Sequence, residues 1–299
     1  MLAFFCYKQL MENTPMFGET GYTYENASIV IVPIPFEGTV SYKGGTANGP
    51  EAIISASPNA EMFDMATERD YTKLKQTLAP QLDVTGITEE VMERIEKSVS
   101  RILDDGKMPF LLGGEHSITG PAVRAVAKHY EKSGEKIGVV QIDAHADLRD
   151  EYSGTIHSHA AVMRRIIEVA PAVQLGIRSC SIEEWKLIKE KNLRVLQPAE
   201  TFSKGKLDEA LATLPEKIYL TVDIDGLDPS LIPATGTPEP GGFSWNEVME
   251  IFKTILKTKM IIGGDLVELA PIKGFHSPDF IASRLAFRMM SLMPGAFDK

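Results

Sequence analysis

Short apolar segments alternate with amphipathic segments along most of the chain. Seven segments have the continuous Val, Ile and Leu character of buried strands, namely 28–34, 109–114, 136–144, 172–177, 193–197, 217–225 and 260–269. Six segments between them carry apolar residues at helical spacing, namely 87–106, 117–134, 159–170, 182–192, 206–215 and 244–258. This alternation predicts an α/β fold in which helices flank a parallel sheet.

The same pattern favours a single domain over residues 1–299. No Pro/Gly/Ser-rich linker, internal repeat or low-complexity tract divides the chain. Residues 1–27 and the loop 41–53 precede the regular alternation, so we expect them to pack on a face of the sheet or at a subunit contact. The segment 279–293 has helical spacing and is predicted to belong to the core.

Composition narrows the range of partners. The chain has 31 Lys and Arg against 41 Asp and Glu, a formal net charge of −10, and no dense basic run that would bind nucleic acid. Cys6 and Cys180 match no metal or redox spacing and are expected to be reduced thiols. With neither a recognisable secretory signal nor an apolar run of about 20 residues, we expect a cytoplasmic protein with no membrane partner.

Acidic and histidine side chains follow four of the predicted strands, where open α/β sheets collect their ligands. These residues are Glu115 and His116 in "LLGGEHS", Asp143, His145 and Asp147 in "IDAHAD", Asp223, Asp225 and Asp228 in "TVDIDGLDPS", and Asp265 and Glu268 in "GGDLVELAP".

The spacing of these residues predicts a metal centre. In an extended backbone, positions 143, 145 and 147 point to one side, and so do 223 and 225. Burying such carboxylates without compensation costs several kcal/mol each, and a divalent cation removes that cost. Carboxylates with a minority of imidazoles suit Mn²⁺, and two bridged ions would need about two histidines and four aspartates. Either motif alone is commonly a cap or a turn, but their combination favours a metal site.

In this order, the motifs "GGEHS", "DAHAD", "SHA", "DIDGLDPS" with "PATGTPEPGG", and "VEL" resemble those of the ureohydrolases, the arginase and agmatinase family. The resemblance covers about residues 30 to 290, and "PFEGTVSYKGGTANGPEAI" is similar to the agmatinase branch. It implies a three-layer α/β/α domain with a mostly parallel sheet, two Mn²⁺ ions per subunit, hydrolysis of guanidino compounds to urea and an amine, and a homotrimer or homohexamer.

The resemblance also implies a ligand set. One ion would be held by His116, Asp143, Asp147 and Asp223, and the other by Asp143, His145, Asp223 and Asp225. Asp143 and Asp223 would therefore bridge the two ions.

A mechanism follows from this set. Two bound ions would lower the pKa of water and so supply hydroxide at neutral pH, and Asp225 would orient that hydroxide. A histidine must then protonate the departing amine, and His159 fits the family pattern better than His157, which is the second candidate. Glu268 matches the carboxylate that accepts hydrogen bonds from the guanidinium. Asp265 and Glu115 are expected to play supporting roles.

The charges in the loop "LRDEYSGTIHS" indicate which substrate tail the site would accept. Its Asp150 and Glu151 would repel a carboxylate and tolerate an amine, which favours agmatine, with putrescine and urea as products and polyamine synthesis as the pathway. Arg149 and Arg178 could instead capture a carboxylate, which leaves guanidinobutyrate, guanidinopropionate, arginine and formiminoglutamate as alternatives.

Two other classes of protein compete with this interpretation. Deacetylases of the related fold use a single zinc and lack the paired ligands, so His116 argues against them. A non-catalytic family member is the other alternative, but all six expected ligand positions are filled, which favours catalysis.

Overall fold

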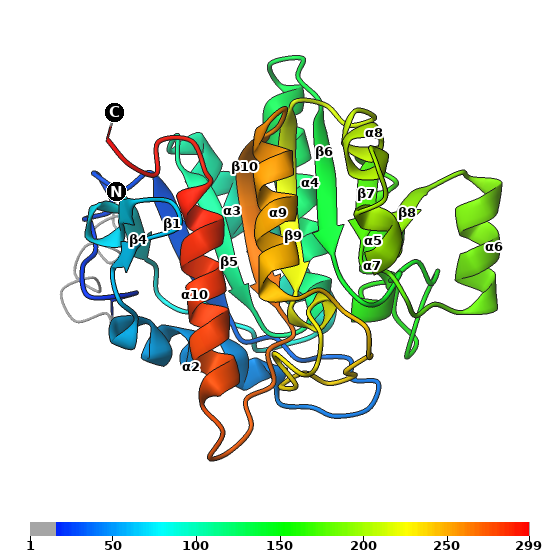
Figure 1. Ribbon diagram of the computed structural model, residues 1–299, viewed down its shortest axis with the longest axis horizontal. Helices are drawn as coiled ribbons and strands as arrows, with labels where there is room; N and C mark the ends of the chain where they lie inside the picture. The colour runs from blue at the N-terminus through cyan, green and yellow to red at the C-terminus, as the bar shows by residue number, and fades with distance from the viewer. Residues whose placement is uncertain (1–15, 299) are drawn as a thin grey trace.

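An eight-stranded sheet forms the centre of the computed structural model, which describes residues 16–298 (Figure 1). The strand order is β4-β1-β5-β10-β9-β6-β7-β8, and all neighbours pair in parallel. The strands are β1 (Ile29–Ile34), β4 (Gln76–Leu78), β5 (Met108–Gly113), β6 (Ile137–Ile142), β7 (Ala172–Leu175), β8 (Arg194–Leu196), β9 (Lys217–Asp223) and β10 (Met260–Val267). A separate antiparallel pair joins β2 (Phe63–Asp64) to β3 (Arg69–Asp70).

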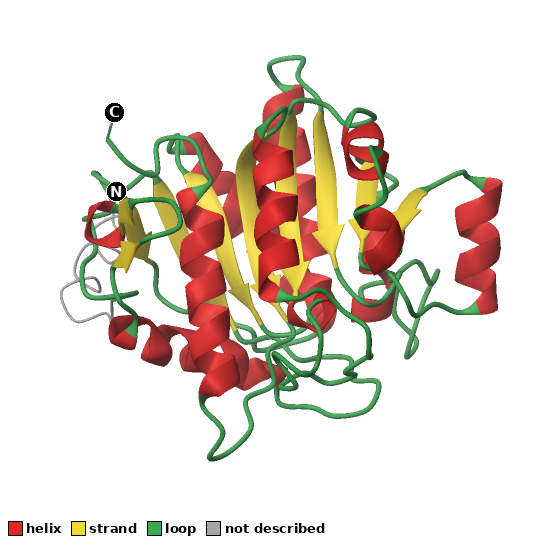
Figure 2. Ribbon diagram, in the orientation of Figure 1, coloured by secondary structure: helices red, strands yellow, loops and turns green. Residues whose placement is uncertain are grey.

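Helices cover both faces of the sheet and complete three layers (Figure 2). One face packs against α2 (Gly49–Ala56), α8 (Lys206–Leu211), α9 (Trp245–Leu256) and α10 (Ser277–Ser291), and the other against α3 (Thr88–Asp104), α4 (Thr119–Glu131) and α5 (Val162–Ile166). The short helices α6 (Ile182–Glu190) and α7 (Pro198–Thr201) lie beside the β8 edge. The predicted α/β/α fold with a parallel central sheet is confirmed.

Some local predictions were wrong. Residues 49–53, predicted as loop, begin α2, which has a proline in its first turn, where the missing N–H costs nothing. The three-residue strand β4 was not predicted because it is too short to show a pattern. The predicted helix 159–170 is confined to a 3-10 turn and the five residues of α5. Residues 1–15 of the expected N-terminal extension, with Cys6, lie outside the described residues.

The order of strands explains where polar side chains gather. The four strands that precede acidic or histidine residues are β5, β10, β9 and β6, and they are consecutive in the middle of the sheet. Because all four run in the same direction, their carboxyl ends open onto one edge of the sheet. The predicted polar residues are therefore brought to a common place by topology.

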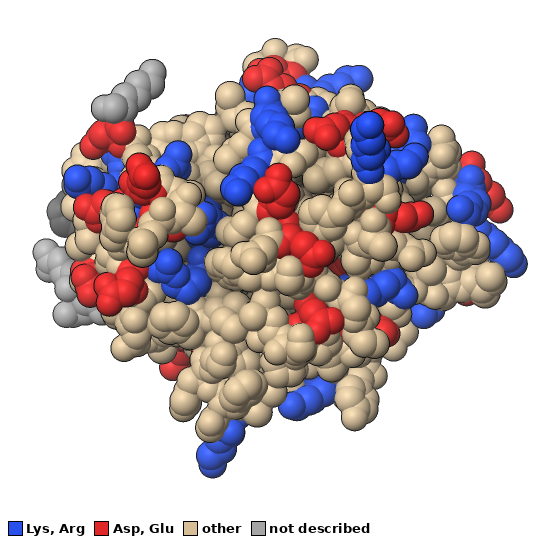
Figure 3. All heavy atoms as spheres, in the orientation of Figure 1, with Lys and Arg blue, Asp and Glu red and all other residues tan. Residues whose placement is uncertain are grey.

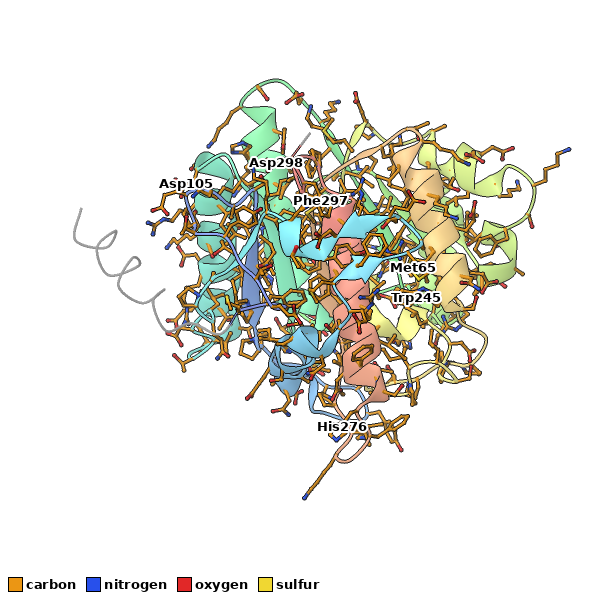
Figure 4. The ribbon with its side chains drawn as sticks, turned by 60° about the vertical axis from the view of Figure 1, so that its left-hand side comes forward. Met65, Asp105, Trp245, His276, Phe297 and Asp298 are labelled. Carbon is orange, nitrogen blue, oxygen red and sulfur yellow. The ribbon has the colours of Figure 1, made fainter. Side chains whose placement is uncertain are left out.

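The face drawn in Figure 3 carries charges of both signs, with Lys and Arg interspersed among Asp and Glu. Figure 4 shows His276 where the preceding loop meets the start of α10, and its side chain is 86% exposed. Within residues 16–298, no helix is both long and apolar enough to cross a bilayer.

Gly114, between β5 and the polar cluster, has no room for a side chain. A Cβ built on it would lie 2.1 Å from the carbonyl oxygen of Phe36, far inside van der Waals contact. We expect Gly114→Ala to lower the free energy of unfolding by about 2–4 kcal/mol, because backbone on both sides must move. Chemical denaturation measures this loss.

Gly120 provides the matched control, because it lies in α4 and its Cβ would meet nothing closer than 3.7 Å. Gly120→Ala should leave stability unchanged or slightly higher, since alanine favours the helix. Equal losses in both variants would contradict the assignment of a close backbone contact at Gly114.

Candidate metal centre

His116 lies at the centre of the first group of candidate ligands. Its Nδ1 is 3.0 Å from Asp143 Oδ2, 3.2 Å from Asp147 Oδ2 and 3.4 Å from Asp223 Oδ2. The imidazole is 1% exposed, and its Nε2 lies 2.8 Å from the hydroxyl of Thr221. The contact with Thr221 fixes the ring so that Nδ1 faces the carboxylates.

A second group forms around His145. Its Nδ1 is 2.9 Å from Asp225 Oδ2 and 3.8 Å from Asp143 Oδ1. His145 is 25% exposed, so this group lies nearer to solvent than the first. Asp143 belongs to both groups, and its two oxygens face different histidines.

Tight turns place several of these side chains. His116 begins one 3-10 turn, and Asp225 lies in another that follows directly on β9. Asp147 has a φ of +53°, in the left-handed region that non-glycine residues seldom adopt. Its carbonyl accepts hydrogen bonds from the N–H groups of Met163 and Arg164, which hold the turn in place.

Burial and mutual repulsion act on the acids. Burial, with the nearby charges of Asp147 and Asp225, raises the pKa of Asp143 to about 7. The pKa of Asp223 is raised well above its ordinary value, first by burial and then by Asp225 and Asp143. Burial alone would lower the pKa of His145, but Asp225 raises it to about 10. The acids therefore need positive charge to be ionised together.

The donor set fits a divalent cation. His116 Nδ1 is buried and, among the described residues, has no hydrogen-bond partner, although three carboxylate oxygens surround it. A nitrogen lone pair and carboxylate oxygens converging on one point are ligands for ions such as Mn²⁺. The residues present could therefore hold metal in both groups.

A pocket of about 310 Å³ opens over these groups. His159 and Glu268 line it, and so does the buried acid Glu184, which belongs to neither ligand group. Glu268 accepts a hydrogen bond of 2.7 Å from the N–H of His116, and burial raises the pKa of Glu268 well above its ordinary value. A cationic group entering the pocket would meet both Glu184 and Glu268.

The two histidines proposed for proton transfer are separated by the fold. His159 lines the pocket, with Thr39 Oγ1 2.8 Å from its Nδ1 and Ser41 Oγ 2.9 Å from its Nε2. Burial lowers the pKa of His159, which favours its neutral form. His157 lies outside the pocket lining, and the charges nearest to it belong to Arg124, Glu89 and Arg165.

Glu115 anchors the loop that contacts His159. Its carboxylate accepts hydrogen bonds from the N–H groups of Gly38 and Thr39 and from the hydroxyls of Thr39 and Ser117. Burial raises the pKa of Glu115 to about 7, although these donors oppose the shift. Glu115 thus supports the site through Thr39, in line with its expected supporting role.

Asp150 and Glu151, the two acids from which an amine-tailed substrate was predicted, lie away from the pocket. Asp150 is 77% exposed and pairs with Arg165 at 2.8 Å, and neither Asp150 nor Glu151 lines the pocket. Both side chains are exposed at the surface. Arg178 is also occupied, because its guanidinium donates to the carbonyls of Gly176, Asp225, Glu239 and Pro240.

Several residues at the site were not singled out from sequence. Thr39 and Ser41 come from a segment far from His159 in the chain, so no local pattern linked them. Gln141 precedes Asp143 by two positions and therefore faces the same side, a signal that was present in "VVQID". Glu184 accepts from the N–H groups of Leu148 and Ser181, and only the fold reveals it in the pocket.

Comparisons with known proteins agree with this geometry. A family model described as the Arginase family matches residues 27–292. The N(1)-aminopropylagmatine ureohydrolase of a Synechocystis strain is 38% identical, with 95% of this chain and 93% of that protein covered. The agmatinase of Pyrococcus horikoshii is 31% identical, with 90% and 93% covered. The crystal structure of agmatine ureohydrolase of Thermoplasma volcanium aligns with a TM-score of 0.82 at 29% identity, covering 95% of this chain and 98% of that one.

Metal binding should depend on pH in a defined direction. In metal-free protein the raised pKa of Asp143, about 7, leaves it protonated at pH 6 and ionised at pH 8, so an entering ion must displace a proton at the lower pH. We expect Mn²⁺ to raise the melting temperature more at pH 8 than at pH 6, with affinity roughly tenfold higher from this group alone. Thermal unfolding with and without Mn²⁺ at each pH measures the effect.

The control is Asp143→Asn, which removes the carboxylate common to both groups and should abolish the Mn²⁺-dependent shift at either pH. Equal shifts at pH 6 and pH 8 in the unaltered protein would show that protons do not compete with the ion at this site.

Proposed function

This chain belongs to the arginase family, and from that premise we propose that it hydrolyses the guanidino group of agmatine to urea and putrescine. The chain is a ureohydrolase that acts on guanidino compounds. One observation carries the proposal further: the two ligand groups share Asp143 and lie in the same pocket as His159 and Glu268. A site for metal, a carboxylate for the guanidinium and a proton carrier thus occur together.

The family is metal-dependent, and we propose two Mn²⁺ ions per subunit. One ion would take His116, Asp143, Asp147 and Asp223 as ligands, and the other Asp143, His145, Asp223 and Asp225. When bound, the ions would lower the pKa of water and supply a nucleophile at neutral pH, which a resonance-stabilised guanidinium requires.

Glu268 is proposed to orient the substrate. Its side chain is buried and lines the pocket, and a planar guanidinium can donate paired hydrogen bonds to a carboxylate. A φ of +65° at Glu268, together with the hydrogen bond from its N–H to the carbonyl of Gly114, fixes the direction of this side chain. The substrate carbon is thereby held facing the ligand groups.

His159 is proposed to carry the proton that the departing amine requires. The two hydroxyls of Thr39 and Ser41 contact its ring nitrogens and hold the ring at the pocket wall. Since burial lowers the pKa of His159, the ring is neutral at rest and can accept a proton before passing it to the departing amine.

The pocket offers residues of both charges to the tail of the substrate, the end opposite the guanidino group. Glu184 supports an amine tail, while Lys43 and Arg149 line the same pocket and are the groups that a carboxylate tail would meet. N(1)-aminopropylagmatine is a second candidate, because a relative with that activity in its name is 38% identical over 95% of this chain. Its hydrolysis would give urea and aminopropyl-putrescine.

We further propose that the protein is a single-domain, cytoplasmic homo-oligomer, a trimer or a hexamer, as the family resemblance implies. The single eight-stranded sheet over the described residues supports one domain. Sedimentation of the purified protein would decide the oligomer number.

A substrate panel tests the proposed activity. Urea release by Mn²⁺-loaded protein is compared as kcat/KM for agmatine, N(1)-aminopropylagmatine, arginine, guanidinobutyrate and guanidinopropionate. We expect the two amine-tailed compounds to exceed the three carboxylate-bearing ones at least tenfold, because Glu184 attracts an amine and repels a carboxylate. Preference for a carboxylate-bearing compound would assign the tail to Lys43 and Arg149 instead.

His159→Ala should lower kcat by about 10²–10⁴, the usual contribution of a proton carrier, while leaving Mn²⁺ stoichiometry unchanged. His157→Ala is the matched control, and we expect a change of less than about twofold, because His157 does not line the pocket. Steady-state kinetics with metal analysis of each variant makes the comparison. A larger loss at His157 would reverse the assignment.

A further inference from the structure

Two glutamines are buried behind the ligand groups, outside the pocket. Gln141 on β6 and Gln174 on β7 are 0% and 2% exposed and are register partners on neighbouring strands. Gln141 Nε2 donates to Asp143 Oδ2 at 2.6 Å. Gln174 Nε2 donates both to Gln141 Oε1 at 2.6 Å and to the carbonyl of Ala146 at 2.7 Å.

The direction of these hydrogen bonds is forced. The carbonyl of Ala146 can only accept, so the atom of Gln174 that faces it must be the amide nitrogen. That same nitrogen faces Gln141, which must therefore present its oxygen. The remaining end of the Gln141 amide is then a donor, and it is aimed at Asp143. A reversed amide would place an oxygen against the carboxylate of Asp143 and leave two acceptors in contact.

This arrangement matters because Asp143 is common to both ligand groups. Its Oδ1 accepts from the N–H of His145 at 2.6 Å, and its Oδ2 accepts from Gln141. Each carboxylate oxygen has two lone-pair directions, so one on each oxygen remains for an ion. The two donors also prevent the buried carboxylate from rotating away from the two groups.

Gln174 acts on the other ligands as well. The Ala146 carbonyl that it holds lies between His145 and Asp147, in the tight turn with the positive φ. The pair thus joins the turn carrying two candidate ligands to the strand β7, and joins both to the carboxylate of Asp143. Packing alone does not require two glutamines at these positions, because two apolar side chains could fill the same space between the strands.

We propose that Gln141 and Gln174 are positioning residues that set the orientation of Asp143 and of the 145–147 turn for divalent metal. The proposal rests on the proposed metal centre and extends it to two residues that touch neither metal nor substrate. Hydrogen-bond partners of metal ligands typically contribute 10- to 100-fold in metal affinity.

The test is Mn²⁺ titration of metal-free protein by calorimetry, without substrate. Gln141→Leu removes the donor while keeping a similar volume, and we expect Mn²⁺ affinity to fall roughly 10- to 100-fold. Gln174→Met leaves the amide of Gln141 in place but free to reverse, so a smaller fall, roughly 3- to 10-fold, is expected. The second variant also keeps the test available if Gln141→Leu does not fold.

Gln76 supplies the matched control. It is a buried glutamine in β4 of the same sheet, 1% exposed, and its Nε2 donates to the carbonyls of Phe17 and Thr20, away from the ligand groups. Gln76→Leu should lower the melting temperature while leaving Mn²⁺ affinity within about twofold of the unaltered protein. A loss of affinity that simply follows lost stability would appear in this variant as well.

The outcomes separate the two proposals. Two Mn²⁺ bound by the unaltered protein, with weaker binding only in the Gln141 and Gln174 variants, supports the positioning role whatever the substrate panel shows. Unchanged affinity in both variants overturns the positioning role and leaves the metal centre intact. If the unaltered protein binds no divalent ion, both the metal centre and the positioning role fall.

Discussion

Repulsion among buried carboxylates is the constraint on which this structure depends. Asp143 follows β6 and Asp223 ends β9, and burial raises the pKa of both carboxyls. Asp147 Oδ2 lies 3.2 Å from Nδ1 of His116, beside the same two acids. Backbone geometry that few residues can adopt holds these acids together. It comprises the left-handed conformation of Asp147, the 3-10 turn that directly follows β9, and Gly114, which has no room for a side chain. Such a cluster lowers the stability of a protein unless cations neutralise it, which accords with a family that is metal-dependent.

The central strands and the positions of the candidate ligands could be predicted from the sequence, because both depend on simple patterns of apolar and polar residues. Continuous apolar runs predicted the central strands. The alternation of polar residues with small or apolar ones in "DAHAD" and "DID" predicted that the ligands point to one side of the chain. The six candidate ligands come together in the structure because their strands are parallel neighbours, a topology that strand and helix alternation already favours. The strand β4 was not predicted, because three residues are too few to show a periodic pattern.

What could not be predicted depends on contacts between distant segments. Asp150 and Glu151 are close in sequence to the ligands, yet both are exposed at the surface, where Asp150 pairs with Arg165. Glu184 takes their place in the pocket from a helix more than thirty residues later. Likewise, Thr39 reaches His159 across 120 residues. A sequence shows which residues are neighbours along the chain, but the lining of this pocket comes from segments that are far apart in the sequence.

The position of β10 has a consequence for how the protein is made. It is the last strand in the chain, yet it lies between β5 and β9, which carry His116 and Asp223 at their ends. In a chain emerging from the ribosome, every candidate metal ligand is therefore made before the strand that separates β5 from β9. Until Met260–Val267 inserts between its two neighbours, His116 is not held at its distance from Asp223, whereas Asp143, His145 and Asp225 follow the directly paired strands β6 and β9. The first ligand group is therefore completed only when this late strand takes its place, while the second group does not depend on it.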